Sequence, residues 1–232
     1  MYLDSPKNER SFLGLSGHQL HQALIDALRR GLLYGITDLR FGHGSHLEAA
    51  QALVEAGICL VQYRGKDTPR ARQLEELLEL VPWAAERGAA VVVNDDAAMA
   101  RAVGAAGLHL GQGDRPPLEA RDLVGPHVLL GLSTHNRQQA LSALGQPVDY
   151  LGVGPAYATQ TKPQEPEAGL GFLAWASQEI TLPQVAIGGI TEERLGEVLK
   201  TGQKSPALIT ALLGAPDLRA SVARISARLA DC

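Results

Sequence analysis

Short apolar runs alternate with stretches of helical periodicity along most of the chain. The runs are about four to six residues long, which is typical of strands. Between them, leucine, valine and isoleucine recur every three or four residues, which predicts helices with one buried face. We predict strands at Leu32–Thr37, Cys59–Tyr63, Ala89–Val93, Gly107–Leu110, Val128–Leu132, Tyr150–Val153, Gln184–Ile187 and Ala207–Thr210.

This alternation determines the expected fold class. Runs that are apolar on both faces indicate a parallel sheet covered by helices. Eight strand–helix units favour an α/β fold of the (β/α)8 TIM-barrel type, with an open doubly wound sheet as the alternative. Leu20, Leu24 and Leu28 predict an extra helix before the first strand. We therefore expect an N-terminal extension over residues 1–31 and one barrel domain over residues 32–232.

Composition narrows the classes of partner. The 232 residues include 25 acidic and 21 basic side chains, a net charge of −4, and only 4% are aromatic, so we expect no nucleic-acid partner. Met1–Arg10 is polar, and nowhere do about 18 apolar residues run together, so we expect a soluble, cytoplasmic protein with no membrane partner. Cys59 and Cys232 lack the spacing of a metal site or redox motif.

Candidate chemistry follows from the rule that catalytic residues of a parallel barrel lie where its strands end. The second strand runs into Gln62, Arg64 and Lys66, which alternate onto one side and present an amide with two cations. This combination suits an anionic, oxygen-rich ligand. Solvated surface charges are the alternative interpretation of the same residues.

Carboxylates follow the next two strands. Asp95, directly after Asn94, and Asp114 would follow neighbouring strands, which lie about 4.8 Å apart, so both could reach one cation. Mg²⁺ typically takes one or two carboxylates together with waters and substrate phosphates. We prefer a helix-capping role for Asp96.

Hydroxyl groups and glycines follow the later strands. Ser133 lacks the glycine-flanked turn of a serine nucleophile, so we interpret it as a hydrogen-bond donor, and His135 as a satisfied loop histidine. The long loop from Pro155 to about Gly169 resembles an active-site lid and carries the polar run 159–162.

The last two predicted strands end where barrels commonly bind phosphate through backbone N–H groups. Glycines 188 and 189 follow the seventh strand and would let the backbone approach phosphate oxygens closely. Ile209 and Thr210 close the eighth strand. A tight turn without any ligand is the alternative.

The ordered motifs Q-x-R-x-K, N-D, G-x-H-L-G-Q-x-D, G-x-S-x-H, G-V-G-P-x-Y-x-T-x-T-K and A-I-G-G-I together resemble the thiamine phosphate synthase (thiamine-phosphate pyrophosphorylase) family, from about Leu33 to Thr210. The resemblance implies a barrel enzyme, a transferase of thiamine biosynthesis. It would join hydroxymethylpyrimidine diphosphate to hydroxyethylthiazole phosphate, with Mg²⁺ as cofactor and diphosphate as leaving group.

The resemblance also implies roles for individual residues. The pyrimidine diphosphate would be held by Gln62, Arg64, Lys66, Asn94, Ser133 and Lys162. Mg²⁺ would be ligated by Asp95 and Asp114. The thiazole phosphate would be held by Thr159, Thr161, Gly189, Ile209 and Thr210. In the family the diphosphate is thought to leave first, giving a pyrimidine methylene cation, and the groups assisting its departure here would be Arg64, Lys66, Ser133 and Lys162.

Some positions depart from the family pattern. Gly65 stands where the family usually has a larger residue, Gly202–Pro206 replaces a Gly-Ala-Asp-Gly segment, and Thr210 replaces a common serine. Two other functions therefore stay open: a thiazole tautomerase that binds the thiazole phosphate without condensation, and a non-catalytic phosphate-binding module. The sequence leaves open whether the chain forms a homo-oligomer, and whether the leading helix plugs the barrel or pairs with another subunit.

Overall fold

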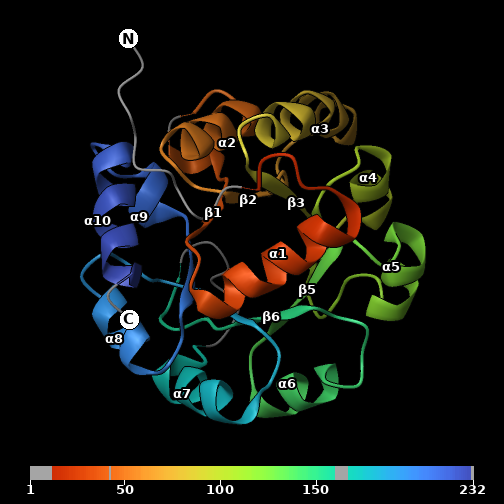
Figure 1. Cartoon of the computed structure of the whole chain (residues 1–232). Helices are drawn as coiled ribbons and strands as arrows, with labels where there is room; N and C mark the ends of the chain where they lie inside the picture. Colours follow the sequence, from red (N-terminus) through yellow and green to blue (C-terminus); the bar gives the residue numbers. More distant parts are fainter. Residues whose placement is uncertain (1–11, 42, 160–166, 231–232) are drawn as a thin grey trace.

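The computed structural model describes residues 12–41, 43–159 and 167–230, and its strands close into one barrel (Figure 1). Every neighbouring pair is parallel, in the order β1-β2-β3-β4-β5-β6-β7-β8, and β1 pairs with β8. The strands are β1 Tyr34–Ile36, β2 Leu60–Tyr63, β3 Ala90–Asn94, β4 Gly107–Leu110, β5 Leu129–Thr134, β6 Tyr150–Val153, β7 Gln184–Ala186 and β8 Ser205–Leu208. The (β/α)8 barrel is confirmed, and the open sheet is excluded because β1 and β8 pair.

Helices that follow the strands form an outer ring, and α1, which precedes them, lies across one end of the barrel (Figure 1). The helices are α1 Gly17–Arg30, η1 Leu39–Phe41, α2 His46–Glu55, α3 Arg70–Ala85, α4 Ala97–Ala102, α5 Pro117–Val124, α6 Arg137–Ala143, α7 Gly169–Glu179, α8 Leu195–Lys200, α9 Thr210–Leu213 and α10 Leu218–Ala230. Among these described helices, none is long and apolar enough to cross a lipid bilayer.

The eighth strand differs most from its predicted position. We predicted Ala207–Thr210, but β8 begins at Ser205, and Thr210 opens α9. Apolar content was a poor guide to the start of this strand because Ser205 is polar yet fully buried. Its hydroxyl donates to Leu28 O at 2.8 Å and accepts from Leu32 N at 2.8 Å. A buried hydroxyl with both bonds made is compatible with a core strand.

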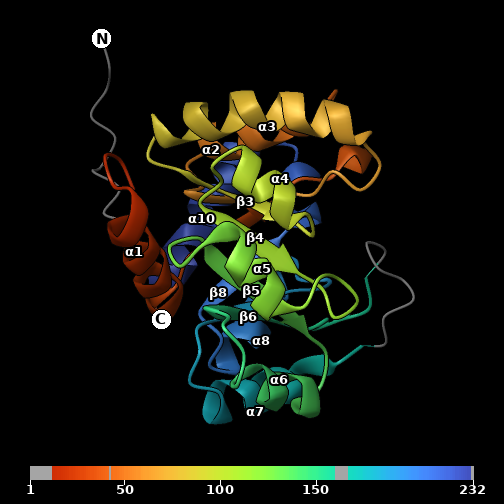
Figure 2. The same cartoon turned by 90° about the vertical axis from the view of Figure 1, so that its right-hand side faces the viewer.

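The leading helix α1 closes one end of the barrel. Leu24, Ala27 and Leu28 are buried in the same cluster as barrel-interior residues such as Leu60 and Val185. The contacts of this helix and of the segment before it lie at the beginnings of strands. Leu28 O of α1 accepts from Ser205 Oγ at the start of β8, and Phe12 N, before α1, donates to Gly88 O, before β3, at 2.9 Å. Figure 2 shows α1 at one end of the barrel, opposite the end where the strands finish. Of the two roles left open, the structure therefore supports the plug.

Candidate active site

A cavity of about 380 Å³ opens at the carboxyl ends of the strands, a size typical of small-molecule sites. It is lined from all around the barrel, from Tyr34 on β1 to Ala207 on β8. The predicted site residues that line it are Gln62, Arg64, Asn94, Ser133, Thr159, Gly189, Ile209 and Thr210. The fold therefore brings together residues from both predicted anion-binding groups. Thr161 and Lys162 lie outside the described residues.

A second cluster lies at the ends of β2, β3 and β4 and is not part of the described cavity lining. Lys66 Nζ lies 3.1 Å from Asp95 Oδ2, and Asp114 Oδ2 accepts a hydrogen bond from Gly111 N at 2.7 Å. Asp95 has a φ of 65°, a left-handed conformation that is rare outside glycine and often found at functional sites. Its backbone N–H donates to His109 O at 2.8 Å, which helps to hold it there.

The two carboxyl groups of this cluster interact directly. Burial raises the pKa of Asp95, a side-chain hydrogen bond with Asp114 raises it further, and the charge of Lys66 partly offsets both effects. Two adjacent carboxyl groups cannot both be ionised cheaply unless a cation lies between them. Two carboxylates in contact provide the oxygen donors that suit a hard divalent ion such as Mg²⁺.

Inside the barrel, five side chains form a continuous hydrogen-bonded chain. Gln62 Nε2 donates to Tyr34 Oη at 3.1 Å, and Tyr34 Oη lies 3.2 Å from Tyr150 Oη. The ring of His109 continues the chain, with Nδ1 2.8 Å from Tyr150 Oη and Nε2 2.9 Å from Ser133 Oγ. Burial raises the pKa of both tyrosines, so their hydroxyls stay neutral. The chain orients Gln62 and Ser133 from below the cavity.

Two strand glycines make room for these rings. A Cβ at Gly131 would lie 2.1 Å from Tyr150 Cζ, and one at Gly152 would lie 3.2 Å from His109 Cε1. A larger residue at 131 would displace the Tyr150 ring. In the sequence, these two strand glycines are the local signal for the hydrogen-bonded chain of side chains, and the sequence analysis assigned them no role.

The loop after β1 positions Arg64 from the opposite side. Thr37 Oγ1 accepts a hydrogen bond from Arg64 N at 3.0 Å and lies 2.8 Å from His46 Nδ1. Nearby, Asp38 pairs with Arg40, whose Nε donates at 2.9 Å. Burial alone would raise the pKa of Asp38, but the hydrogen bonds from Arg40 outweigh it and lower the pKa. Arg40 lines the cavity and is a site residue that the sequence analysis missed.

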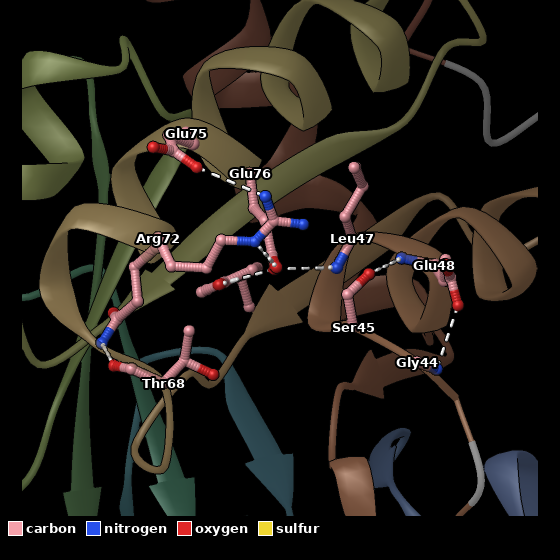
Figure 3. A network of polar contacts seen from close by, with 10 residues as sticks. Gly44, Ser45, Leu47, Glu48, Thr68, Arg72, Glu75 and Glu76 are labelled. Carbon is pink, nitrogen blue, oxygen red and sulfur yellow. Dashed lines mark hydrogen bonds and ion pairs between the residues drawn. The ribbon is translucent and has the colours of Figure 1, made fainter.

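A buried carboxylate fixes the end of β2 against two helices. Glu76 of α3 is only 3% exposed, and it accepts hydrogen bonds from Tyr63 Oη at 2.9 Å, Leu47 N at 3.1 Å and Arg72 Nε at 2.9 Å. Figure 3 shows the Arg72 guanidinium and the Leu47 backbone N–H directed at this carboxylate from α3 and α2. Because Tyr63 immediately precedes Arg64, these contacts hold the strand that presents Arg64.

Two glycines shape the other end of the cavity. Gly188 and Gly189 have φ values of 97° and 61°. A Cβ at Gly189 would lie 2.8 Å from Ala158 O, so the backbone here packs too tightly for a side chain. Such a turn exposes N–H groups to an anion. Arg194, also missed from the sequence, donates from Nη1 to Gly189 O at 3.0 Å and lines the cavity.

The turn after β7 leads into α8, which begins at Leu195. Thr191 Oγ1 accepts a hydrogen bond from Arg194 N at 3.3 Å within this turn. The Arg194 guanidinium lies 4.5 Å from the centre of the Tyr157 ring, which packs the turn against the loop after β6.

Two other interpretations agree with the structure. Asp96 is the N-cap of α4 and accepts from Met99 N at 2.8 Å. His135 lines the cavity with Nδ1 2.8 Å from Gly154 O, so this ring nitrogen is the donor to a carbonyl and is not a base.

Three arginines line the cavity, and among its described lining residues none is Asp or Glu. The cavity therefore favours anionic ligands.

Residues 33–212 match the family model described as thiamine monophosphate synthase. The chain belongs to the thiamine monophosphate synthase family. It is 42% identical over 208 residues to a thiamine-phosphate synthase of Pelotomaculum thermopropionicum, covering 86% of this chain and 95% of that protein. A thiamine-phosphate synthase of Caldicellulosiruptor saccharolyticus is 36% identical, covering 83% of this chain and 88% of that one.

A solved structure agrees with these matches. Thiamine phosphate pyrophosphorylase from Pyrococcus furiosus superposes with a TM-score of 0.80 at 31% identity, covering 88% of this chain and 98% of that one. The motif resemblance found in the sequence is thereby confirmed. The chain is an enzyme, a transferase of thiamine biosynthesis that acts on small molecules.

Proposed function

We propose that the enzyme joins hydroxymethylpyrimidine diphosphate to hydroxyethylthiazole phosphate, releases diphosphate and requires Mg²⁺. The observation that best supports this is the cavity itself: residues suited to two different anions line opposite parts of one 380 Å³ space with no carboxylate among the described lining. Two phosphorylated substrates that must react with each other need such an arrangement.

The diphosphate would bind near β2 to β5. Arg64, Gln62, Asn94 and Ser133 provide cationic and neutral donors within the cavity, and Lys66 stands at the adjoining rim. The hydrogen-bonded chain through the two tyrosines fixes the Gln62 amide and the Ser133 hydroxyl before any substrate arrives. Groups held in advance stabilise developing charge better than groups that must reorient.

Asp95 and Asp114 are the residues that would hold Mg²⁺. Their contact, the raised pKa of Asp95 and their oxygen donors fit a hard cation. When bound, such an ion neutralises charge on a departing diphosphate. Lys66 already lies 3.1 Å from Asp95, so its ammonium would stand beside the same leaving group.

The thiazole phosphate would bind at the ends of β7 and β8. Gly189, Ile209 and Thr210 line the cavity and would offer their backbone N–H groups, and Arg194, which donates to Gly189 O, lines the cavity beside them. Thr159 adds a hydroxyl from the loop after β6. In this assignment, the thiazole ring points inward, toward the centre of the barrel.

The reaction would proceed with departure of the diphosphate first, followed by capture of the pyrimidine methylene cation by the thiazole nitrogen. Such a route needs no protein nucleophile, and the nearby hydroxyl of Tyr34 stays neutral because burial raises its pKa. Apolar lining from Ile36, Val185 and Ala207 would exclude water that could trap the cation.

A condensation assay with both substrates, with and without Mg²⁺, tests the proposal. We expect thiamine phosphate and diphosphate in equal amounts, and little of either after chelation of the metal. Isomerisation of the thiazole phosphate without condensation would identify a tautomerase instead. Binding of both phosphates without turnover would identify a non-catalytic module.

A further inference from the structure

Three histidines meet at the closed end of the barrel, far from the cavity. His18 and His21 lie one turn apart on α1, and His127 comes from the segment between α5 and β5. One ring nitrogen from each lies within 4.8 Å of those of the other two. The ring centroids of His18 and His127 are 5.4 Å apart, and those of His21 and His127 are 6.4 Å apart.

A partly buried carboxylate, Asp149, stands behind His21. Nε2 of His21 is buried, lies 3.1 Å from Asp149 Oδ2, and makes no hydrogen bond of good geometry within the described ranges. Metal-binding histidines commonly give their second ring N–H to a carboxylate. A small rotation of the His21 ring would let Nε2 donate to Asp149 while Nδ1 binds a metal ion.

Arg121 organises the rest of this end. Its guanidinium donates to Asp149 Oδ2 at 2.7 Å, to Gly125 O at 2.9 Å and to Val128 O at 2.7 Å. The last two carbonyls flank His127 in the chain. One side chain therefore holds both the carboxylate behind His21 and the loop that presents His127, so these two rings are positioned by contacts that need no metal.

We propose that His18, His21 and His127 bind a divalent transition-metal ion of the Zn²⁺ class, which fastens α1 to the barrel. Three imidazoles are typical donors for Zn²⁺, Ni²⁺, Co²⁺ and Cu²⁺, whereas Mg²⁺ prefers oxygen ligands. The two ends of the barrel would thus select different ions: an oxygen-ligated cation at Asp95 and Asp114, and a nitrogen-ligated one at the histidines.

Such an ion would bind only the folded chain. The histidines of α1 and His127 come from distant parts of the sequence, and the barrel brings them together. A ligand that binds only the native state stabilises it in proportion to ligand concentration. The ion would therefore hold down the helix that plugs the barrel.

Calorimetric titration of the full chain with ZnCl₂ tests this site. Excess Mg²⁺ is present throughout so that it occupies the oxygen-ligated sites. The variants are His18→Ala and His127→Ala, whose side chains are exposed and whose loss leaves the core intact. His43→Ala is the matched control, a histidine near the opposite end of the barrel. Melting curves with and without Zn²⁺ provide a second readout.

We expect one Zn²⁺ to bind the unmodified chain and the His43→Ala control, and affinity to fall by at least about tenfold in the other two variants. At a hundredfold excess of Zn²⁺ over Kd, Tm should rise by about 5–10 °C in the first pair and much less in the second. Equal Zn²⁺ affinity in all four proteins, or no Zn²⁺ binding by the unmodified chain, would overturn the proposal.

Discussion

His109 Nε2 lies 2.9 Å from Ser133 Oγ, and the opposite nitrogen of the same ring lies 2.8 Å from Tyr150 Oη. The imidazole therefore transmits the position of a buried tyrosine to a hydroxyl at the cavity. Without the contact to His109, the Ser133 hydroxyl could rotate freely. This relationship makes Tyr150 a positioning residue for substrate binding.

Replacing Tyr150 by Phe should both destabilise the protein and weaken binding of the pyrimidine diphosphate. The change leaves the Tyr34 hydroxyl and His109 Nδ1 without their shared partner, which costs about 1–3 kcal/mol. We expect KM for the pyrimidine diphosphate to rise while KM for the thiazole phosphate is unchanged. Ser205→Ala is the control, because it removes a fully buried hydroxyl that bonds to Leu28 O and Leu32 N at the closed end of the barrel. An equal rise of KM in both variants would show that lost stability alone is responsible.

Replacing Asp95 by Asn should abolish most Mg²⁺-dependent turnover yet stabilise the metal-free protein at neutral pH. Burial and Asp114 raise the pKa of Asp95, so the folded state binds this proton more tightly than the unfolded state. Its contribution to stability is therefore complete below the ordinary Asp pKa and is lost as the pH rises through the raised one. The Tm advantage of the variant should be present at neutral pH and shrink on acidification. Melting curves of both proteins across this pH range, without divalent ions, measure the effect. A variant that is less stable than the unmodified protein at neutral pH would contradict the prediction.

Replacing Arg64 by Ala should lower kcat by about 10²–10³ if its guanidinium stabilises the departing diphosphate. Its backbone N–H, which donates to Thr37 Oγ1 at 3.0 Å, is kept in the variant, so the loop should stay in place. Steady-state kinetics with both substrates at saturation measure the effect. Arg219→Ala, which removes an exposed arginine that donates to Glu55 O, should leave kcat unchanged. A change in kcat below threefold in the Arg64 variant would remove this residue from the proposed mechanism.

Replacing Gly189 by Ala should weaken binding of the thiazole phosphate. Its φ of 61° is strained for alanine, and the new Cβ would lie 2.8 Å from Ala158 O, so the turn must shift. We expect KM for the thiazole phosphate to rise at least about tenfold with little change for the other substrate. Gly171→Ala on α7 is the control, because open space surrounds it and alanine favours helices by about 1 kcal/mol. A control variant with the same defect would point to general destabilisation.

Replacing Lys162 by Ala should slow departure of the diphosphate and spare binding of the thiazole phosphate. The motif resemblance assigns this lysine to the pyrimidine diphosphate, and loss of one charged donor typically costs about 10²–10³ in rate. Single-turnover kinetics measure the chemical step, and titration with the thiazole phosphate alone measures binding. Unchanged single-turnover rates would exclude Lys162 from the chemistry.

Much of the fold could be predicted because its signals are local. Strand and helix periodicities depend on side chains within a few residues of each other, so eight strands were found with only small errors at their ends. The largest error, at β8, arose because Ser205 is polar yet fully buried, and its partners Leu28 and Leu32 are distant in sequence. Barrel closure followed from strand number and was confirmed by pairing of β1 with β8.

The candidate site divides in the same way. The sequence alone determined which residues follow each strand, and hence that Gln62, Ser133 and Gly189 share one rim. Only the tertiary structure decided that Tyr34 and Tyr150 join across the barrel interior, that Arg194 turns back to the cavity, and that α1 lies over the far end. These contacts link segments far apart in the chain, and their geometry depends on how the closed barrel packs, so no local pattern of hydrophobic and polar positions encodes them.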